Sequence, residues 1–175
     1  IYTTLALNVA TFEMPDHCGT CTRCLEACPT GALLSPRTLD SRLCISYLTI
    51  ESRQIPPPEL REKIGDWFFG CDICQLVCPW NIKIHGREQL ERLKATPSGR
   101  GHLLEDLRFI LTSSNRELER TFSGTPLTRA GGWGLKRNAL IVAANMRASE
   151  LREEIQSLLS YPKLGELAAW ALKRL

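Results

Sequence analysis

The sequence predicts an α+β fold that is mostly α-helical, made of a small cysteine-rich domain followed by a basic helical domain. All eight cysteines lie between Cys18 and Cys78, and residues 79–175 have none. Helical periodicity dominates beyond residue 102. The charge also changes sign. Residues 1–81 hold 6 Lys and Arg against 9 Asp and Glu, a net −3, whereas residues 82–175 hold 16 against 10, a net +6.

Length and composition exclude several classes of protein. The chain has 175 residues and is 43% hydrophobic, which suits one or two packed domains and argues against disorder. No run of 18 apolar residues is present, so no membrane-spanning helix is expected. The opening stretch IYTTLALN lacks the features of a signal peptide and starts without Met. We therefore expect residues 1–16 to lead in from a preceding domain of a longer chain.

The first cysteine box has the spacing of bacterial iron–sulfur ferredoxins. CGTCTRCLEACP places Cys18, Cys21, Cys24 and Cys28 in the pattern C-x2-C-x2-C-x3-C-P. Three thiolates on a tight loop surround one cubane, while the fourth points away and ligates the other cluster in two-cluster ferredoxins. Clustering at these spacings indicates metal ligation rather than disulfides.

The second box, GCDICQLVCPWN, supplies only three cysteines, so one ligand must come from elsewhere. The remaining cysteine is Cys44, in LDSRLCISYLTIE, and eight thiolates complete two sets of four. By analogy with two-cluster ferredoxins we expect the sets to be crossed between the boxes. Cluster 1 takes Cys18, Cys21, Cys24 and Cys78, and cluster 2 takes Cys28, Cys44, Cys71 and Cys74.

Other arrangements of the cysteines remain open at this point. An uncrossed pattern would join residues 18/21/24/28 and 44/71/74/78, with strain at each C-x3-C step. Structural zinc also uses four cysteines, and Cys44 alone is compatible with a buried structural role. The spacing favours two [4Fe–4S] clusters, that is, a bacterial dicluster ferredoxin-like domain over residues 17–81.

Within the cysteine-rich part, CISYLTIE (44–51) is expected to form a strand. Beyond residue 101 the chain is expected to be helical, apart from a loop at 123–134. Pro58 and Glu59 suit the first turn of a short helix, and Ser114 with Glu117 forms a capping box. Helices joined by short turns stack antiparallel, as in helical-repeat proteins, although an irregular bundle is the alternative. The expected helices beyond residue 100 span 102–111, 115–122, 135–146, 150–160 and 163–175.

Four segments together resemble the epoxyqueuosine reductase family over nearly the whole chain. They are CGTCTRCLEACPTGAL, LDSRLCISYLTIE, IGDWFFGCDICQLVCPWN and FSGTPLTRAGGWGLKRNALIVAANM. The resemblance implies the reduction of epoxyqueuosine to queuosine at the wobble position of tRNA, with cobalamin and electrons relayed by two [4Fe–4S] clusters. It also implies that residues 82–175 form a HEAT-like basic helical domain, and it agrees with the crossed ligand sets.

Members of the family carry an N-terminal domain that binds much of the cobalamin and supplies the catalytic acid, so we expect no catalytic residue within this sequence. Residues beside the cluster ligands are candidates to line the cofactor or substrate cleft: Ser46, Tyr47, Glu51 and Gly70. Ordinary strand packing is the alternative for the first three, and a helix C-cap is the alternative for Gly70.

Basic residues around the Gly-rich loop are candidates for contacts with tRNA phosphates, with solvated surface charge as the alternative. They are Arg129, Lys136, Arg137 and Arg147. Asn138 is expected to bind a phosphate or a neighbouring loop. Trp133 is the best candidate among the tryptophans for stacking on a base.

Two further functional classes are compatible with the cysteine pattern. A stand-alone dicluster ferredoxin-type electron carrier is the main alternative, and a nucleic-acid-binding module with structural clusters is another. The basic helical half argues against a simple carrier. The partners we expect are tRNA and an electron donor of unspecified kind, with no membrane, and the expected state is a monomer in the cytoplasm.

Overall fold

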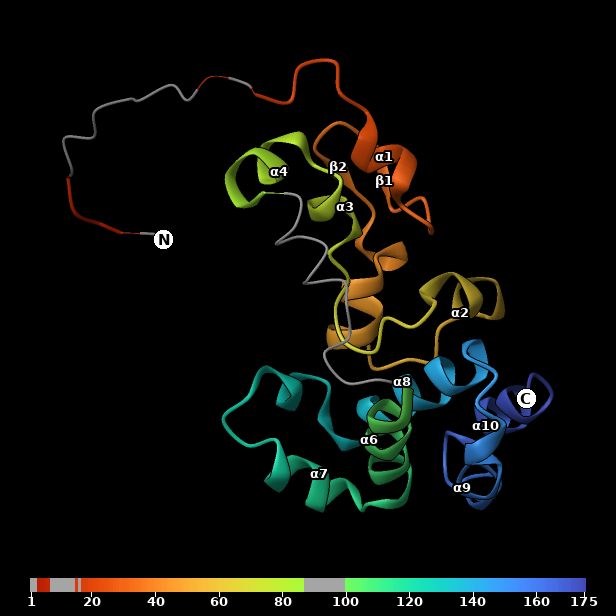
Figure 1. Ribbon diagram of the computed structural model, residues 1–175. Coiled ribbons are helices and arrows are strands. Elements are labelled where there is room, and N and C mark those ends of the chain that lie inside the picture. The colour runs from red at the N-terminus through yellow and green to blue at the C-terminus, as the bar shows by residue number, and fades with distance from the viewer. Residues whose placement is uncertain (1–2, 7–14, 16, 87–99) are drawn as a thin grey trace.

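The cysteine-rich part of the chain folds into short helices around a small hairpin. The computed structural model describes residues 3–6, 15, 17–86 and 100–175, and Figure 1 shows this part above the longer helices. Strands β1 and β2 pair antiparallel, with Leu33 opposite Leu39. The elements are α1 (Arg23–Ala27), β1 (Leu33–Ser35), β2 (Thr38–Leu39), the 3-10 helix η1 (Ser41–Leu43), the π-helix η2 (Tyr47–Glu51), α2 (Pro58–Ile64), α3 (Ile73–Leu76) and α4 (Pro79–His85).

The second part consists of helices packed around α8 (Gly131–Asn145). Helix α8 contacts α2, α6, α7 and α10. Every residue of α8 from Leu135 to Ala144 is buried. The predicted capping box is confirmed, because the Glu117 amide donates to the Ser114 hydroxyl at 3.1 Å. The other elements are α6 (Arg100–Thr112), α7 (Asn115–Thr121), the 3-10 helices η3 (Pro126–Arg129) and η4 (Ser149–Leu151), α9 (Arg152–Ser157) and α10 (Gly165–Leu172).

One hydrophobic core joins the two parts. Ile45, Leu48, Leu60 and Ile64 are buried together with the apolar side chains of the helices around α8. The predicted fold class, mostly α with a double-cluster domain followed by a helical domain, is confirmed. The boundary expected at residues 81 and 82 stays a prediction, and α4 spans it. Among the described helices, none combines the length and apolar character that crossing a bilayer requires.

The segment CISYLTIE is helical, so the prediction of a strand is wrong. After the turn that ends at Cys44, residues 45–46 are α-helical and residues 47–51 form η2. The Ser52 amide donates to the Tyr47 carbonyl at 2.9 Å, a bond across five residues. β-Branched residues favour strands, but burial of Ile45, Leu48 and Thr49 on one face decides the outcome here.

The Gly-rich stretch predicted as a loop is also largely helical. It contains η3 and the first turn of α8, which starts at Gly131. A Cβ added at Gly132 would lie 2.5 Å from the Asn115 Cα and 2.7 Å from the Asn115 carbonyl oxygen. The glycine is therefore needed for the close approach of α8 to α7, and its low helix propensity is overridden by packing.

Gly132→Ala is expected to destabilise the protein by about 1–3 kcal/mol, because the methyl group meets backbone atoms that must move. Gly101→Ala is the matched control, since a Cβ at this exposed helical glycine meets no atom within 4 Å. That change should stabilise the protein by up to about 1 kcal/mol. Thermal unfolding followed by circular dichroism measures both effects. Equal stabilities for the two variants would contradict the packing argument.

Candidate iron–sulfur centre

The first cysteine box forms a tight turn that leads into α1. The Cys21 amide donates to the Cys18 carbonyl at 3.1 Å, and Gly19 within this turn has a φ of +51°. Cys24 lies on α1, and Cys28 directly follows that helix as its C-cap. The four side chains of one short segment therefore leave the backbone in different directions.

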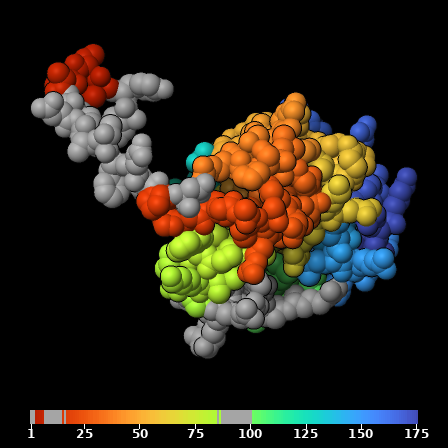
Figure 2. All heavy atoms as spheres, turned by 90° about the horizontal axis from the view of Figure 1, so that it is seen from above, coloured from red at the N-terminus to blue at the C-terminus, as the bar shows by residue number. Residues whose placement is uncertain are grey.

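The second box has a related arrangement on α3 and α4. Cys74 lies on α3, and Cys78 is the N-cap of α4, with Pro79 at the first helical position, where no amide hydrogen is needed. Helix α1 packs against α3, so the two boxes face each other. Figure 2 shows the first box, in red and orange, beside the yellow-green segment of α4.

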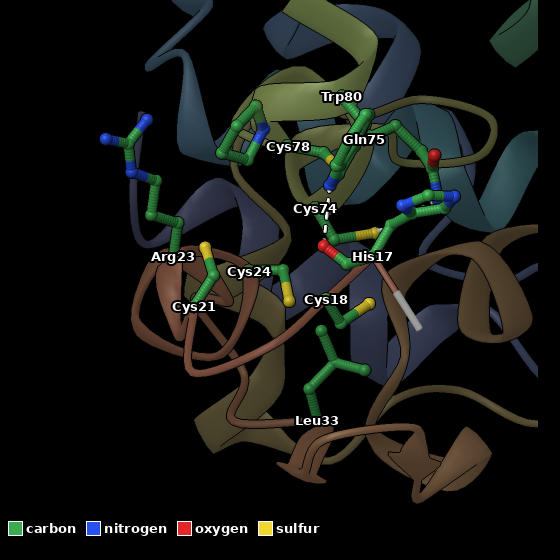
Figure 3. A pocket seen from close by; sticks show the side chains of 11 residues that line it. His17, Cys18, Cys21, Arg23, Cys24, Leu33, Cys74, Gln75, Cys78 and Trp80 are labelled. Carbon is green, nitrogen blue, oxygen red and sulfur yellow. Dashed lines mark hydrogen bonds between the residues drawn. The ribbon is translucent and has the colours of Figure 1, made fainter. Parts of the chain in front are cut away.

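The first of two cavities between the boxes is lined by three cysteines from the first box and two from the second. Its volume is about 220 Å³, and Cys18, Cys21 and Cys24 line it together with Cys74 and Cys78. Figure 3 shows these side chains around the cavity, with residues of the first box on one side and residues of the second box on the other. The lining contains the four cysteines expected for cluster 1, and Cys74, which is expected for cluster 2, also borders this cavity.

The second cavity brings the remaining cysteines together. It has a volume of about 400 Å³, and its lining includes Cys28, Cys44, Cys71 and Cys74. Cys44 comes from the C-cap of η1, far from the other three in sequence. The structure therefore places the isolated cysteine beside the ligands with which it was predicted to act.

The two cavities adjoin each other. Leu33, Cys74 and Gln75 line both of them, so only a few side chains separate the two sites. An electron that enters one site would reach the other across this short partition. The arrangement is suited to relaying electrons.

The donor set fits iron–sulfur clusters better than single ions. No disulfide joins the eight cysteines. Among the described residues, no group of three His, Cys, Asp or Glu side chains converges closely enough to hold one metal ion. Thiolates spread around a cavity suit a cubane whose irons each take one thiolate, whereas a structural zinc site draws four ligands onto a single ion.

The thiols differ in their local electrostatics. The pKa of Cys28 is lowered on balance. Burial alone would raise it, but hydrogen bonds from the Thr30 hydroxyl and from the amides of Ala32, Leu33 and Thr30 to the Cys28 sulfur outweigh that effect. The Ala32 amide lies 3.3 Å from the Cys28 sulfur. Desolvation raises the pKa of Cys71, as do the nearby Cys74 and Cys44. This mutual effect reflects how closely the cysteines of the second cavity approach one another.

Trp80 and His17 at the rim of the first cavity were not singled out as site residues from the sequence. The Trp80 indole N–H donates to the His17 carbonyl at 2.7 Å, and the two rings lie 4.5 Å apart (Figure 3). Trp80 is 40% exposed, so it lies at the surface beside the cavity rather than in the core. A tryptophan directly after a ligand box was the available signal.

The four candidates for the cofactor cleft differ in their surroundings. Tyr47 is 39% exposed, and the exposed Glu51 forms an ion pair with Arg129. The Ser46 hydroxyl donates to the Cys71 carbonyl at 3.2 Å, and the Gly70 amide donates to the Thr49 hydroxyl at 2.9 Å. Gly70 is not a helix C-cap, because α2 ends at Ile64 and Gly65 caps it. Two candidates are therefore accessible, and two are bound within the protein.

Lys136 and Arg137 are buried, which corrects their prediction as phosphate-binding residues. Their exposures are 2% and 0%. Lys136 Nζ donates to the Leu111 carbonyl at 2.6 Å, and Arg137 Nη1 donates to the carbonyls of Ser52 and Gln54 at 2.6 and 2.9 Å. Helix α8 begins five residues before Lys136, so these side chains lie inside the helix rather than at its exposed start.

The remaining basic candidates lie at opposite ends of α8. Arg129 precedes the helix and is exposed, and Arg147 follows it in a left-handed conformation with a φ of +51°. The 15 residues of α8 separate them by about 22 Å, at 1.5 Å per residue. Asn138 is buried and binds the Thr49 carbonyl, as expected for a contact with a neighbouring segment. Trp133 packs against the Arg137 guanidinium.

Comparison with known proteins agrees with this geometry. Residues 17–81 match the model of the 4Fe-4S double cluster binding domain, so this part of the chain is a double-cluster iron–sulfur domain. It is 39% identical to an epoxyqueuosine reductase from Pseudomonas aeruginosa over 91% of this chain and 44% of that protein. The chain belongs to the epoxyqueuosine reductase family.

Solved structures of the family share the fold. A crystal structure of epoxyqueuosine reductase with an epoxyqueuosine-modified tRNA-Tyr stem loop has a TM-score of 0.74 and 35% identity, covering 92% of this chain and 42% of that one. The enzyme from Streptococcus thermophilus has a TM-score of 0.74 and 29% identity, covering 96% of this chain and 44% of that one. The chain thus spans less than half the length of these relatives.

Proposed function

We propose that this chain is the iron–sulfur and tRNA-binding part of an enzyme that reduces epoxyqueuosine to queuosine in tRNA. The observation that carries the proposal is the pair of adjoining cavities, whose linings each contain one predicted set of four cysteines, with Cys74 bordering both. We assign Cys18, Cys21, Cys24 and Cys78 to one [4Fe–4S] cluster, and Cys28, Cys44, Cys71 and Cys74 to the other.

The stoichiometry of the reaction suits two clusters. Converting an epoxide to an alkene removes the oxygen as water and takes two electrons and two protons. Each cluster delivers one electron at a time, so the adjoining pair holds the electrons needed for one turnover. This chain supplies the relay.

Cobalamin would supply the two-electron chemistry at the epoxide when bound. Within this chain, the exposed Tyr47 and Glu51 lie on η2, which directly follows the cavity-lining Ile45 and Ser46, so they would face the cofactor or substrate. Ser46 and Gly70 would hold the cluster-bearing segments, because their polar groups bind Cys71 and Thr49. We place the reaction in the cytoplasm, where reducing conditions preserve thiolate ligands.

The geometry favours Arg129 over Arg147 as a contact for tRNA. Arg129 pairs with Glu51 and so lies at the same edge as the proposed cofactor cleft, while Arg147 lies at the far end of α8. The structure of a relative in complex with a modified tRNA stem loop supports a nucleic-acid partner. The exposed arginine beside the cleft is suited to a backbone phosphate near the anticodon.

Arg129→Ala is expected to weaken tRNA binding by about tenfold and to reduce the salt dependence of binding by about one phosphate contact. Arg147→Ala, which removes an equally exposed charge at the other end of α8, is the matched control and should change affinity less than about threefold. Affinity for the modified anticodon stem loop, measured at several salt concentrations, tests this. Equal losses in both variants would indicate general charge attraction instead.

The proposal as a whole is tested with the full-length protein. It should bind cobalamin, recognised by its visible spectrum, and consume epoxyqueuosine in tRNA when a low-potential reductant is supplied, as measured by nucleoside mass spectrometry. A stand-alone electron carrier would instead reduce and reoxidise its clusters with no change in the tRNA. Absence of both cobalamin and turnover would exclude the reductase.

A further inference from the structure

We propose that Thr49 is a positioning residue for the second cluster, whose hydrogen bonds hold the segments that carry Cys44 and Cys71. This inference rests on the ligand sets assigned above. Thr49 ligates nothing itself, and it is 1% exposed in the middle of η2. Its role follows from what its hydroxyl and its carbonyl each bind.

The Thr49 hydroxyl joins the two ligand-bearing segments. It donates to the Ile45 carbonyl at 2.8 Å and accepts the Gly70 amide at 2.9 Å. Ile45 directly follows Cys44, and Gly70 directly precedes Cys71. One buried hydroxyl therefore connects the neighbours of two ligands that are 27 positions apart in sequence.

A second hydrogen bond runs parallel to the first. The Ser46 hydroxyl donates to the Cys71 carbonyl at 3.2 Å. Gly70 has a φ of +80°, a conformation that other residues rarely adopt, so the turn that presents its amide to Thr49 requires glycine. The two bonds together fix the segment after Cys44 against the segment around Cys71.

The Thr49 carbonyl attaches this assembly to α8. It accepts Asn138 Nδ2 at 2.8 Å and Arg137 Nη2 at 3.4 Å. The Asn138 side-chain oxygen accepts in turn from Arg137 Nε and Nη2 at 3.0 and 2.9 Å, which orients the amide. Thr49 is thus the point at which the cluster segments are tied to α8, which has more buried residues than any other helix in the described part of the chain.

The chemistry explains why threonine occupies this position. Valine has nearly the same shape, but it would leave the part-buried Gly70 amide and the buried Ile45 carbonyl without this partner. Leaving such groups unsatisfied is costly, whereas serine keeps the hydroxyl and loses only a methyl group. The loss should fall on the second cluster, because only its ligands are adjacent to these groups.

The experiment compares Thr49→Val with Thr112→Val in the full-length protein, purified anaerobically with its clusters. Thr112 is the matched control, since its hydroxyl also binds the carbonyl four residues before it, at 2.8 Å, but lies on the exposed surface of α6. Iron release to a chelator is followed over time, together with the EPR spectrum of the reduced protein.

In Thr49→Val, about half of the iron should leave roughly tenfold faster than in the wild type, with an altered EPR signal for one cluster only. Thr49→Ser should restore release to within about twofold, and Thr112→Val should match the wild type. The proposal is overturned if Thr49→Val releases iron like the wild type, if both clusters are affected equally, or if serine fails to restore retention.

If Thr49→Val folds poorly, Ser46→Ala provides a second test of the same attachment. It removes only the hydrogen bond from Ser46 to the Cys71 carbonyl. That variant should also speed the loss of one cluster, and unchanged release would count against the proposal. Cys44→Ser separates the two levels of inference. If it leaves both clusters intact, the ligand assignment fails. If it removes one cluster while Thr49→Val removes none, only the role of Thr49 fails.

Discussion

Cys44→Ser should remove one cluster and leave the other, lowering the iron content of the full-length protein from about eight to about four atoms per chain. Cys44 lines the second cavity with Cys28, Cys71 and Cys74, and it is absent from the lining of the first. Serine is a poor replacement for a thiolate on iron. Because electrons must pass through both sites, reduction of epoxyqueuosine should fall by at least about a hundredfold. Iron and sulfide analysis with a turnover assay measures both effects.

Double variants distinguish crossed from uncrossed ligation. If Cys28 and Cys44 bind the same cluster, replacing both should cost no more iron than replacing one, and about four atoms should remain. Replacing Cys44 and Cys78 together should then remove both clusters. Uncrossed ligation predicts the opposite result for each pair. Four irons in the Cys44 and Cys78 double variant would therefore refute the assignment.

Arg137→Met should cause the largest loss of stability of any single change outside the cysteines, about 3 kcal/mol or more. The guanidinium is fully buried and donates to the carbonyls of Ser52 and Gln54 and to the Asn138 side chain. Removing it leaves the buried Asn138 oxygen and the part-buried Ser52 carbonyl without this partner, at up to about 1–3 kcal/mol for each. Desolvation, followed by the nearby charge of Arg53, lowers the pKa of Arg137 to about 10, so it still carries its charge at neutral pH.

The effect should appear as a melting temperature lower by about 5–10 °C. Arg137→Lys should not restore it, because an ammonium group cannot reproduce the planar fork that reaches two carbonyls at once. Arg147→Met is the control, since loss of an exposed arginine should change stability by less than about 0.5 kcal/mol. A small effect at position 137 would mean that water replaces the side chain.

The sequence predicted the composition of the candidate site better than it predicted the surrounding backbone. The cysteine count pointed to Cys44 as a ligand and the analogy with two-cluster ferredoxins predicted the crossed sets, and the structure brings Cys44 together with Cys28, Cys71 and Cys74. The helical state of 44–51 could not be predicted from the sequence, because β-branched residues favour strands locally and only tertiary burial of Leu48 and Thr49 decides otherwise. The burial of Arg137 could not be predicted from the sequence either, since the carbonyls that it binds are more than 80 positions away.

The position of Thr49 illustrates the same limit. A threonine within an apolar run carries no signal of its own, and its importance comes from partners on three separate segments. The Gly-rich start of α8 was misjudged for a related reason. Glycine disfavours helices on average, but at Gly132 the close approach of Asn115 makes it the residue that fits.

The hydrophobic core is continuous from Ile45 and Leu60 into the helices around α8. This continuity affects how long the protein persists in a cell. Cluster binding is coupled to folding wherever the ligands are fixed by the fold. Oxidative loss of the second cluster would therefore loosen not only the cysteine boxes but also the helices that share their core. Chains damaged in this way would be open to proteolysis, so the amount of intact protein should follow the supply of iron and sulfide.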